Sequence, residues 1–356
     1  MHVIYARNVN EAYVKGLEHL LTHGDKQQTR AGECWVAPTP VTTVYYRPWE
    51  RILWNADRNA NPFFHLAESL WMLGGHNDAT WLDQFVGDFS KRFAEEGGLQ
   101  HGAYGYRWRC HFDVEGGGRP ALPDQLETIV ALIKANPLDR RIVLTMWDPV
   151  ADLAMDKRDI PCNTHVYFRV REERLNHYTV GQALPDSSVV INRFLDMTVC
   201  CRSNDIVWGA YGANAVHFSV LHEYVAARVG VSMGLYYQIS NNYHGYVNTI
   251  PAQEAPWIDL YEDENVVPAR IVTAPKEIDV DLITFFDTWK FDWGGTLQFA
   301  NEFLGNTARP LLKLYARRNE ITDEELAEWP GKTDWDYACK YWLMRRLAKR
   351  RKMQNV

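Results

Sequence analysis

Residues 62–73 are the feature that most constrains the fold, because they predict a helix with almost no polar face. The run Pro-Phe-Phe-His-Leu-Ala-Glu-Ser-Leu-Trp-Met-Leu begins with a proline, which favours a first helical turn, and is stopped by Gly74-Gly75. A helix that is apolar all round must be covered on every side, so the chain needs a large core around it. Glu68 places a carboxylate in the middle of that helix.

The other predicted elements mix helices and strands in an irregular order. Helices are expected at 9–23, at 123–135 and on the stretch that ends at Gly230; strands are expected at 141–147 and 195–201, with a hairpin after residue 162 that turns at 172–174. This order favours an α+β fold over a doubly wound sheet. With 356 residues, 46% of them hydrophobic, and no repeat or long linker, we expect one domain over residues 1–356.

Charge and cysteine usage predict a small ligand and a reducing compartment. The formal charge of -7, from 45 acidic and 38 basic residues, is too mild to indicate a nucleic-acid partner. The cysteines lack metal-ligand spacing, and no apolar stretch approaches the roughly 20 residues that cross a bilayer. We therefore expect a cytoplasmic protein without a metal, a membrane anchor or a signal peptide. The basic stretch 340–352 predicts a solvated final helix, with a phosphate or polyanion contact as the alternative.

Cys162 is the first candidate for chemistry. It follows Pro161 and precedes a predicted strand, a rigid position from which a thiol could face a pocket. A buried, inert cysteine is the commoner fate of this residue type, so position alone does not identify a nucleophile.

Arginines gather at the ends of two predicted strands. Arg140 and Arg141 precede one strand, and Arg202 and Ser203 follow another. The planar guanidinium matches phosphate oxygens, and the Ser203 hydroxyl adds a neutral donor. A surface ion pair is the alternative for each arginine taken singly.

A series of ordered motifs resembles the thymidylate synthases. The motifs are Thr29-Arg30; Glu68 to Gly75; Ala103 to Arg109; Arg140-Arg141; Pro161-Cys162; Arg202-Ser203-Asn204-Asp205 with Gly209; and His244 to Asn248. The resemblance implies one catalytic domain in which residues 249–356 are a divergent C-terminal extension of the fold. It also implies a mixed β-sheet covered by helices, with the sheets of two subunits packed back to back in a homodimer.

The resemblance implies the following catalytic roles. Cys162 would add as a thiolate to C6 of a deoxypyrimidine 5′-monophosphate, and C5 would then take a one-carbon unit from the cosubstrate 5,10-methylenetetrahydrofolate. Arg202 would lower the pKa of the thiol. Glu68 would organise water and relay protons, the alternative being a carboxylate tied to a buried arginine. Tyr104 would assist removal of the C5 proton, and Asp205 would face the folate.

Three groups of binding residues follow from the same resemblance. They are the phosphate-binding Arg30, Arg202 and Ser203 with Arg140 and Arg141 of the other subunit; the base- and sugar-binding Asn214, His244 and Tyr246; and the folate-side Ser90, Asp205 and Gly209.

The sequence departs from the synthases at the final step. A synthase finishes by hydride transfer in a site closed against water. Counting back from Tyr104, one indole that family members place against the intermediate falls on Ser90 and a second on Phe93. The apolar C-terminus that closes family sites is replaced by the basic run 350–356. We therefore predict capture of water and a 5-hydroxymethyl product, as in the hydroxymethylases of bacteriophages with modified DNA bases.

The preferred nucleotide follows from a few positions. Without a gap Ala213 falls on the asparagine that reads uracil, and a one-residue shift at Gly212 would bring Asn214 there. No carboxylate, which would suit cytosine, competes for this position, so dUMP is favoured and dCMP comes next. Ser203 favours a deoxynucleotide. Asn163 replaces a histidine common in the synthases, and both can hold a water near O4.

Two alternatives stay open. One is an ordinary thymidylate synthase that makes dTMP by hydride transfer. The other is a non-catalytic nucleotide- or RNA-binding relative that keeps the phosphate arginines and uses the basic tail. Retention of Cys162, Glu68 and Tyr104 together argues against the second.

Overall fold

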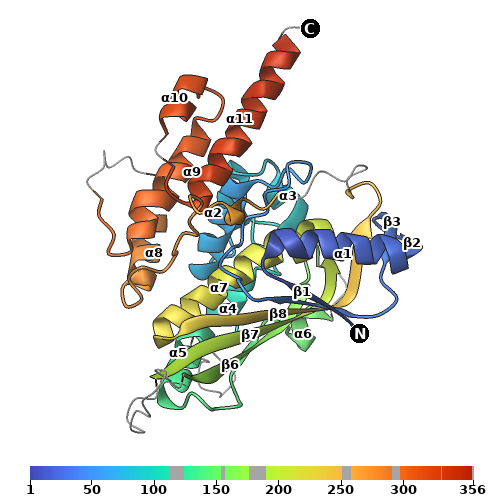
Figure 1. The fold of residues 1–356 in the computed structure, drawn as a ribbon, viewed down its shortest axis with the longest axis vertical. Helices are drawn as coiled ribbons and strands as arrows, with labels where there is room; N and C mark the ends of the chain where they lie inside the picture. The colour runs from blue at the N-terminus through green and yellow to red at the C-terminus, as the bar shows by residue number, and fades with distance from the viewer. Residues whose placement is uncertain are drawn as a thin grey trace, which may run out of the picture.

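A mixed β-sheet forms the base of the structure, with helices packed over it (Figure 1). The computed structural model describes residues 1–112, 124–153, 157–175, 190–250, 258–290, 297–329 and 331–354. The strands are β1 (His2–Ala6), β2 (Asp25–Thr29), β3 (Gly32–Val36), β4 (Val41–Tyr45), β5 (Val143–Thr145), β6 (Asn163–Leu175), β7 (Val190–Asp205) and β8 (Ser232–Tyr246). Their order across the sheet is β1-β4-β8-β7-β6-β5, and β3 joins β8 with β2 beside it.

Strand direction makes the sheet mixed. β1 is parallel to β4 and β7 is parallel to β8, whereas the pairs β4/β8, β6/β7 and β5/β6 are antiparallel. The long strands β6, β7 and β8 form the centre of this sheet. Their register places the residues after Cys162 beside those around Arg202.

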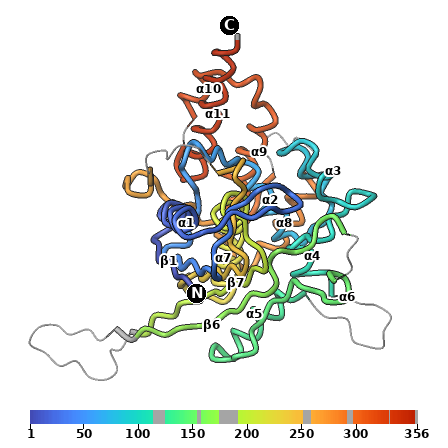
Figure 2. Tube along the Cα trace, turned by 90° about the vertical axis from the view of Figure 1, so that its right-hand side faces the viewer, coloured from blue at the N-terminus to red at the C-terminus, as the bar shows by residue number. Residues whose placement is uncertain are grey.

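Helices supply the layer above the sheet. They are α1 (Val9–His23), α2 (Pro62–Leu73), α3 (Phe89–Phe93), α4 (Tyr104–Arg109), α5 (Gln125–Ala135), α6 (Pro149–Asp152), α7 (Asn214–Val229), α8 (Ile278–Asp287), α9 (Arg309–Ala316), α10 (Asp323–Glu328) and α11 (Asp334–Gln354). Figure 2 shows α9, α10 and α11 at the end of the molecule opposite β6 and β7. Among the described residues, no helix is both long and apolar enough to cross a membrane.

The apolar helix α2 lies in the core, as its sequence predicts. Phe63, Leu66 and Leu70 have no exposed surface. Asn61 caps its first turn, where its side chain accepts the Phe64 N–H. α4 approaches so closely that a Cβ at Gly105 would overlap the Met72 backbone of α2. The helix that carries Glu68 is therefore held rigidly beside the helix that carries Tyr104.

The sequence predictions hold best where caps define an element. The α1 and α2 bounds match the predicted ranges, and α7 ends at Gly230, whose φ of 88° suits glycine. α5 begins at Gln125 after the capping Asp124, and Pro123, where the predicted helix begins, lies outside the described residues. The strand predicted at 141–147 is limited to Val143–Thr145.

The turn predicted at 172–174 is wrong. These residues continue β6 to Leu175 and pair with β7 in register. Glu172 on β6 pairs with Arg193 on β7 at 2.9 Å. Cross-strand charge pairs therefore let a polar run continue as strand, where the sequence pattern indicated a turn.

The basic C-terminal stretch forms the end of α11, as predicted. The first turns of this helix bury Trp335, Trp342 and Leu343, whereas most side chains from 344 to 353 are at least partly exposed. The C-terminal end of α11 projects beyond the other helices (Figure 1).

Candidate active site

One pocket of about 260 Å³ lies where β6 and β7 meet α2, α4 and the start of α7. Its lining is Glu68, Trp71, Met72, Phe89, Phe93, Gln100, Gly102, Ala103, Tyr104, Asp159, Cys162, Ser203, Asn204, Asp205, Trp208, Gly209, Ala213, Asn214 and His217. Segments far apart in the sequence thus bring together a thiol, carboxylates, amides and aromatic walls.

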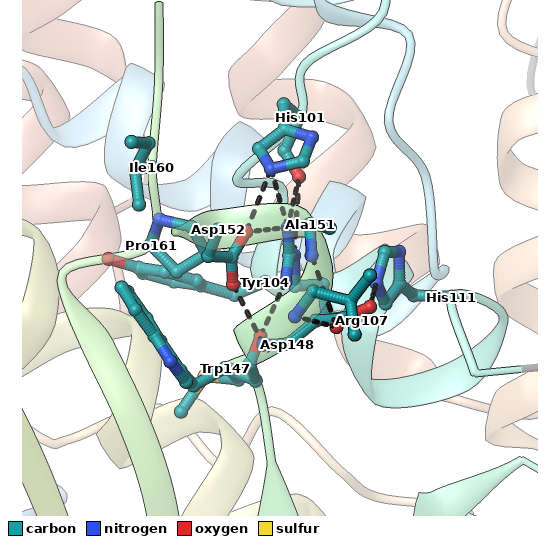
Figure 3. Close-up of polar contacts among 12 residues, drawn as sticks. His101, Tyr104, Arg107, His111, Trp147, Asp148, Ala151, Asp152, Ile160 and Pro161 are labelled. Carbon is teal, nitrogen blue, oxygen red and sulfur yellow. Dashed lines mark hydrogen bonds and ion pairs between the residues drawn. The ribbon is translucent and has the colours of Figure 1, made fainter. Parts of the chain in front are cut away.

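The Cys162 thiol lies between Tyr104 and Arg202. The Cys162 N–H donates to the Tyr104 hydroxyl at 3.3 Å, and Arg202 Nη2 lies 3.8 Å from the Cys162 sulfur. Arg202 also donates to the Ile160 and Pro161 carbonyls, each at 2.9 Å, and stacks on Trp147. Figure 3 shows Ile160 and Pro161 beside the rings of Tyr104 and Trp147. The backbone before the thiol therefore fixes the guanidinium next to it.

Two opposing effects set the electrostatics of the thiol. Burial raises the pKa of Cys162 above its ordinary value, the Arg202 charge opposes this shift, and Asp159 adds to it. We expected Arg202 to lower the pKa of the thiol, and its charge acts in that direction. Desolvation is the larger effect, because it disfavours the thiolate more than one exposed guanidinium favours it.

Within the described part of the chain, Glu68 contacts a histidine and no arginine. His217 Nε2 lies 3.2 Å from Glu68 Oε2. Burial, with the nearby charge of Asp159, raises the pKa of Glu68 from 4.5 to about 8. Burial also lowers the pKa of His217 well below its ordinary value, so the ring is neutral. The pair therefore holds a carboxyl that can exchange a proton near neutral pH.

Tyr104 is held as a neutral phenol. Burial, with the neighbouring Cys162, raises its pKa well above the ordinary value, so the hydroxyl acts as a hydrogen-bonding group. Its helix α4 is anchored by Arg107, which donates to both carboxylate oxygens of Asp152 at 2.7 and 2.8 Å. His101 contacts the same carboxylate at 2.8 Å (Figure 3). This buried ion pair ties α4 to the segment that leads to Cys162.

A chain of amides lies behind the pocket. Asn163 donates to Asn214 Oδ1 at 3.0 Å, and Asn214 donates to Asn204 Oδ1 at 2.9 Å. Asn204 donates in turn to Ser240 at 2.8 Å, and the Cys201 sulfur lies 2.6 Å from Asn163 Oδ1. Each amide in this chain accepts one bond through its oxygen and donates the next through its nitrogen, so the Asn214 amide has one orientation.

Asp205 ends β7 and faces the same pocket. Its Oδ1 accepts the N–H groups of Val207 at 2.8 Å and Trp208 at 2.6 Å, which caps the π-helical turn η3 (Ile206–Ala213). Its Oδ2 is buried with no hydrogen-bond partner among the described residues. Burial raises the pKa of Asp205, and His244 opposes the shift. A buried acceptor without a partner is expected to bind a ligand donor.

The remaining binding residues lie at the rim or farther away. Ser203 lines the pocket, and β7/β8 pairing places His244 opposite Asp205. The His244 and Tyr246 rings lie 5.5 Å apart, and Arg30 is near enough to Tyr246 for an electrostatic interaction between the two side chains. His244, Tyr246 and Arg30 do not line the pocket itself.

Two arginines and one serine are not brought to this pocket. Arg141 is exposed and pairs with Asp139 at 2.7 Å, and Arg140 lines a separate hollow beside β6. Ser90 lies on α3 between the pocket-lining Phe89 and Phe93, but its hydroxyl donates to Asp83 at 2.6 Å. The phosphate role of the arginines and the folate-side role of Ser90 stay predictions.

Comparison with known proteins agrees with this geometry. A family model for thymidylate synthase matches residues 11–264. The deoxyuridylate hydroxymethyltransferase of Pseudomonas phage M6 is 39% identical over 98% of this chain and 95% of its own length. The chain belongs to the thymidylate synthase family.

Other relatives extend the comparison. The deoxyuridylate hydroxymethyltransferase of Bacillus phage SP01 is 31% identical over 86% of this chain and 74% of its own length. A putative thymidylate synthase of Methanothermobacter marburgensis is 31% identical over 64% of this chain and 84% of its own length. The predicted α+β, thymidylate-synthase-like fold is thus confirmed, and the residues after 264 lie outside the family model.

Sequence reasoning missed several pocket residues of this family member. Asp159, Gln100 and His217 line the pocket without having been assigned a role. A signal existed for His217, which lies one helical turn after Asn214 on the same face of α7. Asp159 stands three residues before Cys162, but nothing in the sequence aims its side chain at the pocket.

Proposed function

We propose that this family member transfers a one-carbon unit from 5,10-methylenetetrahydrofolate to C5 of dUMP, and that water captures it to give 5-hydroxymethyl-dUMP. The observation that carries the proposal is the single pocket in which Cys162, Glu68, Tyr104, Asp205 and Asn214 meet. The similarity to the phage deoxyuridylate hydroxymethyltransferases supports the hydroxymethyl product.

The chain's own residues account for the early steps. The Cys162 sulfur adds to C6, and the ring electrons make C5 a nucleophile. Arg202 and the incoming phosphate share one end of the site, while Ser203 supplies a hydroxyl there. Tyr104 orients the group that removes the C5 proton, and Glu68 exchanges protons with the base through water.

The orientation of Asn214 supports uracil. After its bonds to Asn163 and Asn204, the amide keeps one hydrogen and one oxygen lone pair. These match O4 and N3–H of uracil. Gly209 is required beside this amide pair, because a Cβ there would lie 2.5 Å from Asn204 Oδ1.

The pocket also fits a folate. The unpartnered Asp205 Oδ2 is an acceptor for a ring N–H, and aromatic side chains at Trp71, Phe89, Phe93 and Trp208 offer flat walls. When bound, the folate supplies the one-carbon unit. A metal ion has no part in this scheme.

We propose that the protein is a homodimer with shared active sites. The sheet leaves apolar side chains exposed, such as Tyr5 (66%) and Tyr167 (44%), and β8 alternates buried residues with the partly exposed Leu235 and Tyr237. Two such faces packed together would bury this surface. Arg140 and Arg141, which do not line their own pocket, would then reach the partner's phosphate.

We also propose a domain organisation for the chain and a location for the reaction. The chain would act as one catalytic domain, with residues 249–356 as an extension of the fold, because a single buried cluster runs from Ile4 to Leu343. The reaction would take place in the cytoplasm of a phage-infected host, since two of the relatives described above are phage enzymes.

One incubation tests the function. The enzyme is given methylenetetrahydrofolate with dUMP or dCMP, and the nucleotides are read by mass spectrometry. We expect 5-hydroxymethyl-dUMP from wild type and from the exposed-cysteine control Cys110→Ser, and no product from Cys162→Ser. Formation of dTMP would establish the alternative of an ordinary synthase, and absence of any product with nucleotide binding intact would establish a non-catalytic relative.

A further inference from the structure

Asp159 is a pocket carboxylate that has no role in the proposed early steps of the reaction. It lines the pocket with Glu68 and Cys162, and it stands in the short segment that leads to the thiol. A Cβ at Gly102 would lie 2.6 Å from Asp159 Oδ2. The glycine therefore lets the carboxylate lie against the pocket wall.

Gln100 holds this carboxylate in a defined way. Its Nε2 donates to Asp159 Oδ2 at 2.6 Å. The opposite amide orientation would set two acceptors against each other, so the contact fixes the amide. Gln100 Oε1 is then buried with no hydrogen-bond partner among the described residues. Gln100 Oε1 belongs to the amide whose nitrogen contacts the Asp159 carboxylate, and both residues line the pocket, so two acceptors are close together there.

Two adjacent acceptors form a site for the two hydrogens of one water molecule. A water held this way turns an oxygen lone pair away from its acceptors, which suits attack on an electrophilic carbon. Of the other two carboxyls that line the pocket, Glu68 contacts His217, and Asp205 is the acceptor that we assign to the folate. Ser90 donates to Asp83. The pair Gln100 and Asp159 is therefore the better placed water site.

We propose that Asp159 is the general base for the water that captures the exocyclic methylene, and that Gln100 positions that water. The inference rests on the proposed function. The water oxygen bonds to the methylene carbon, its proton passes to the Asp159 carboxylate, and the electron pair of the methylene double bond moves onto the ring as an enolate at O4. Expulsion of Cys162 from C6 then restores the ring double bond, with no oxidant or reductant.

Other groups affect the charge state of this base. Burial raises the pKa of Asp159, whereas the hydrogen bond from Gln100 and the charges of His101, Arg107 and Arg202 lower it. A carboxylate that is less acidic than usual is the stronger base.

The test separates water capture from the earlier steps. In Asp159→Asn, we expect formation of 5-hydroxymethyl-dUMP to fall by about a hundredfold or more, while dUMP binding without folate and single-turnover tritium release from C5-labelled dUMP stay at the wild-type level. Protein mass spectrometry should show a covalent enzyme–nucleotide adduct that carries the extra methylene. A small thiol added to this variant should release a thioether nucleotide, because a thiolate needs no base.

Controls make each outcome decisive. Asp263→Asn changes an exposed carboxylate in the same way and should behave as wild type. Gln100→Met removes the amide acceptor of the water, and we expect the same block of product formation in weaker form. This variant also provides the test if Asp159→Asn does not fold. Wild-type product rates in Asp159→Asn, or an equal loss of tritium release and product, would overturn the role of Asp159. Production of dTMP by wild type would instead overturn the proposed function.

Discussion

Glu68 lies in an apolar helix, and burial there raises its pKa to about 8. If the ionised carboxylate relays protons, kcat/KM for dUMP should fall as the pH drops below 8. Steady-state rates from pH 6 to 9.5 measure this limb. Glu68→Gln should be slower by about a hundredfold or more and should lack the limb. A limb of the same midpoint in the variant would assign it to another group.

The same shift has a consequence for stability. The folded protein holds a proton on Glu68 between its ordinary pKa of 4.5 and about 8. Stability from this group is present below 4.5 and is lost as the pH rises through 8. Glu68→Gln, which stays neutral, should therefore melt higher than wild type at pH 9, with a smaller difference at pH 5. A difference that does not change with pH would contradict the shift.

Asn214 is the residue that we expect to read the base. Asn214→Asp would present a carboxylate to the base, which suits the N3 and N4 pattern of cytosine. We expect the ratio of kcat/KM for dUMP over dCMP to fall by about a hundredfold. Competition between the two nucleotides, read by mass spectrometry, measures that ratio, and an unchanged ratio would show that Asn214 does not read the base.

At the scale of the element, η3 brings Gly209 against the amide chain. A Cβ at Gly209 would lie 2.5 Å from Asn204 Oδ1 and 3.4 Å from Asn214 Nδ2. Gly209→Ala should therefore weaken dUMP binding by about tenfold or more and lower the free energy of unfolding by about 1–3 kcal/mol. Calorimetry and denaturant unfolding test this. Gly87→Ala, where a Cβ would meet nothing within 4 Å, is the matched control.

How well the sequence predicts the structure differs from one element to another. Caps and apolar periodicity locate α1, α2 and α7, because these signals are local. The length of β6 depends on partners in β7, which sequence spacing does not reveal. Among the site residues, sequence motifs identify Cys162 and Glu68. The contact between Gln100 and Asp159 depends on folding that joins distant segments, so only the structure shows it.

At the scale of the whole molecule, shared active sites predict complementation. Cys162→Ser and Arg141→Ala should each be inactive or nearly so. Mixing and refolding them together should restore activity, because mixed dimers contain one site with both native residues. The activity of the mixture, with light scattering for the oligomeric state, tests this. Failure of dimers to recover activity would show that Arg141 does not serve the partner's site.

The most direct test of the account follows the oxygen atom. Wild-type enzyme is incubated with dUMP and methylenetetrahydrofolate in water labelled with heavy oxygen, and both nucleotide and folate products are analysed. We predict 5-hydroxymethyl-dUMP that carries the label, together with tetrahydrofolate and no rise in dihydrofolate absorbance. Unlabelled dTMP formed together with dihydrofolate would contradict it.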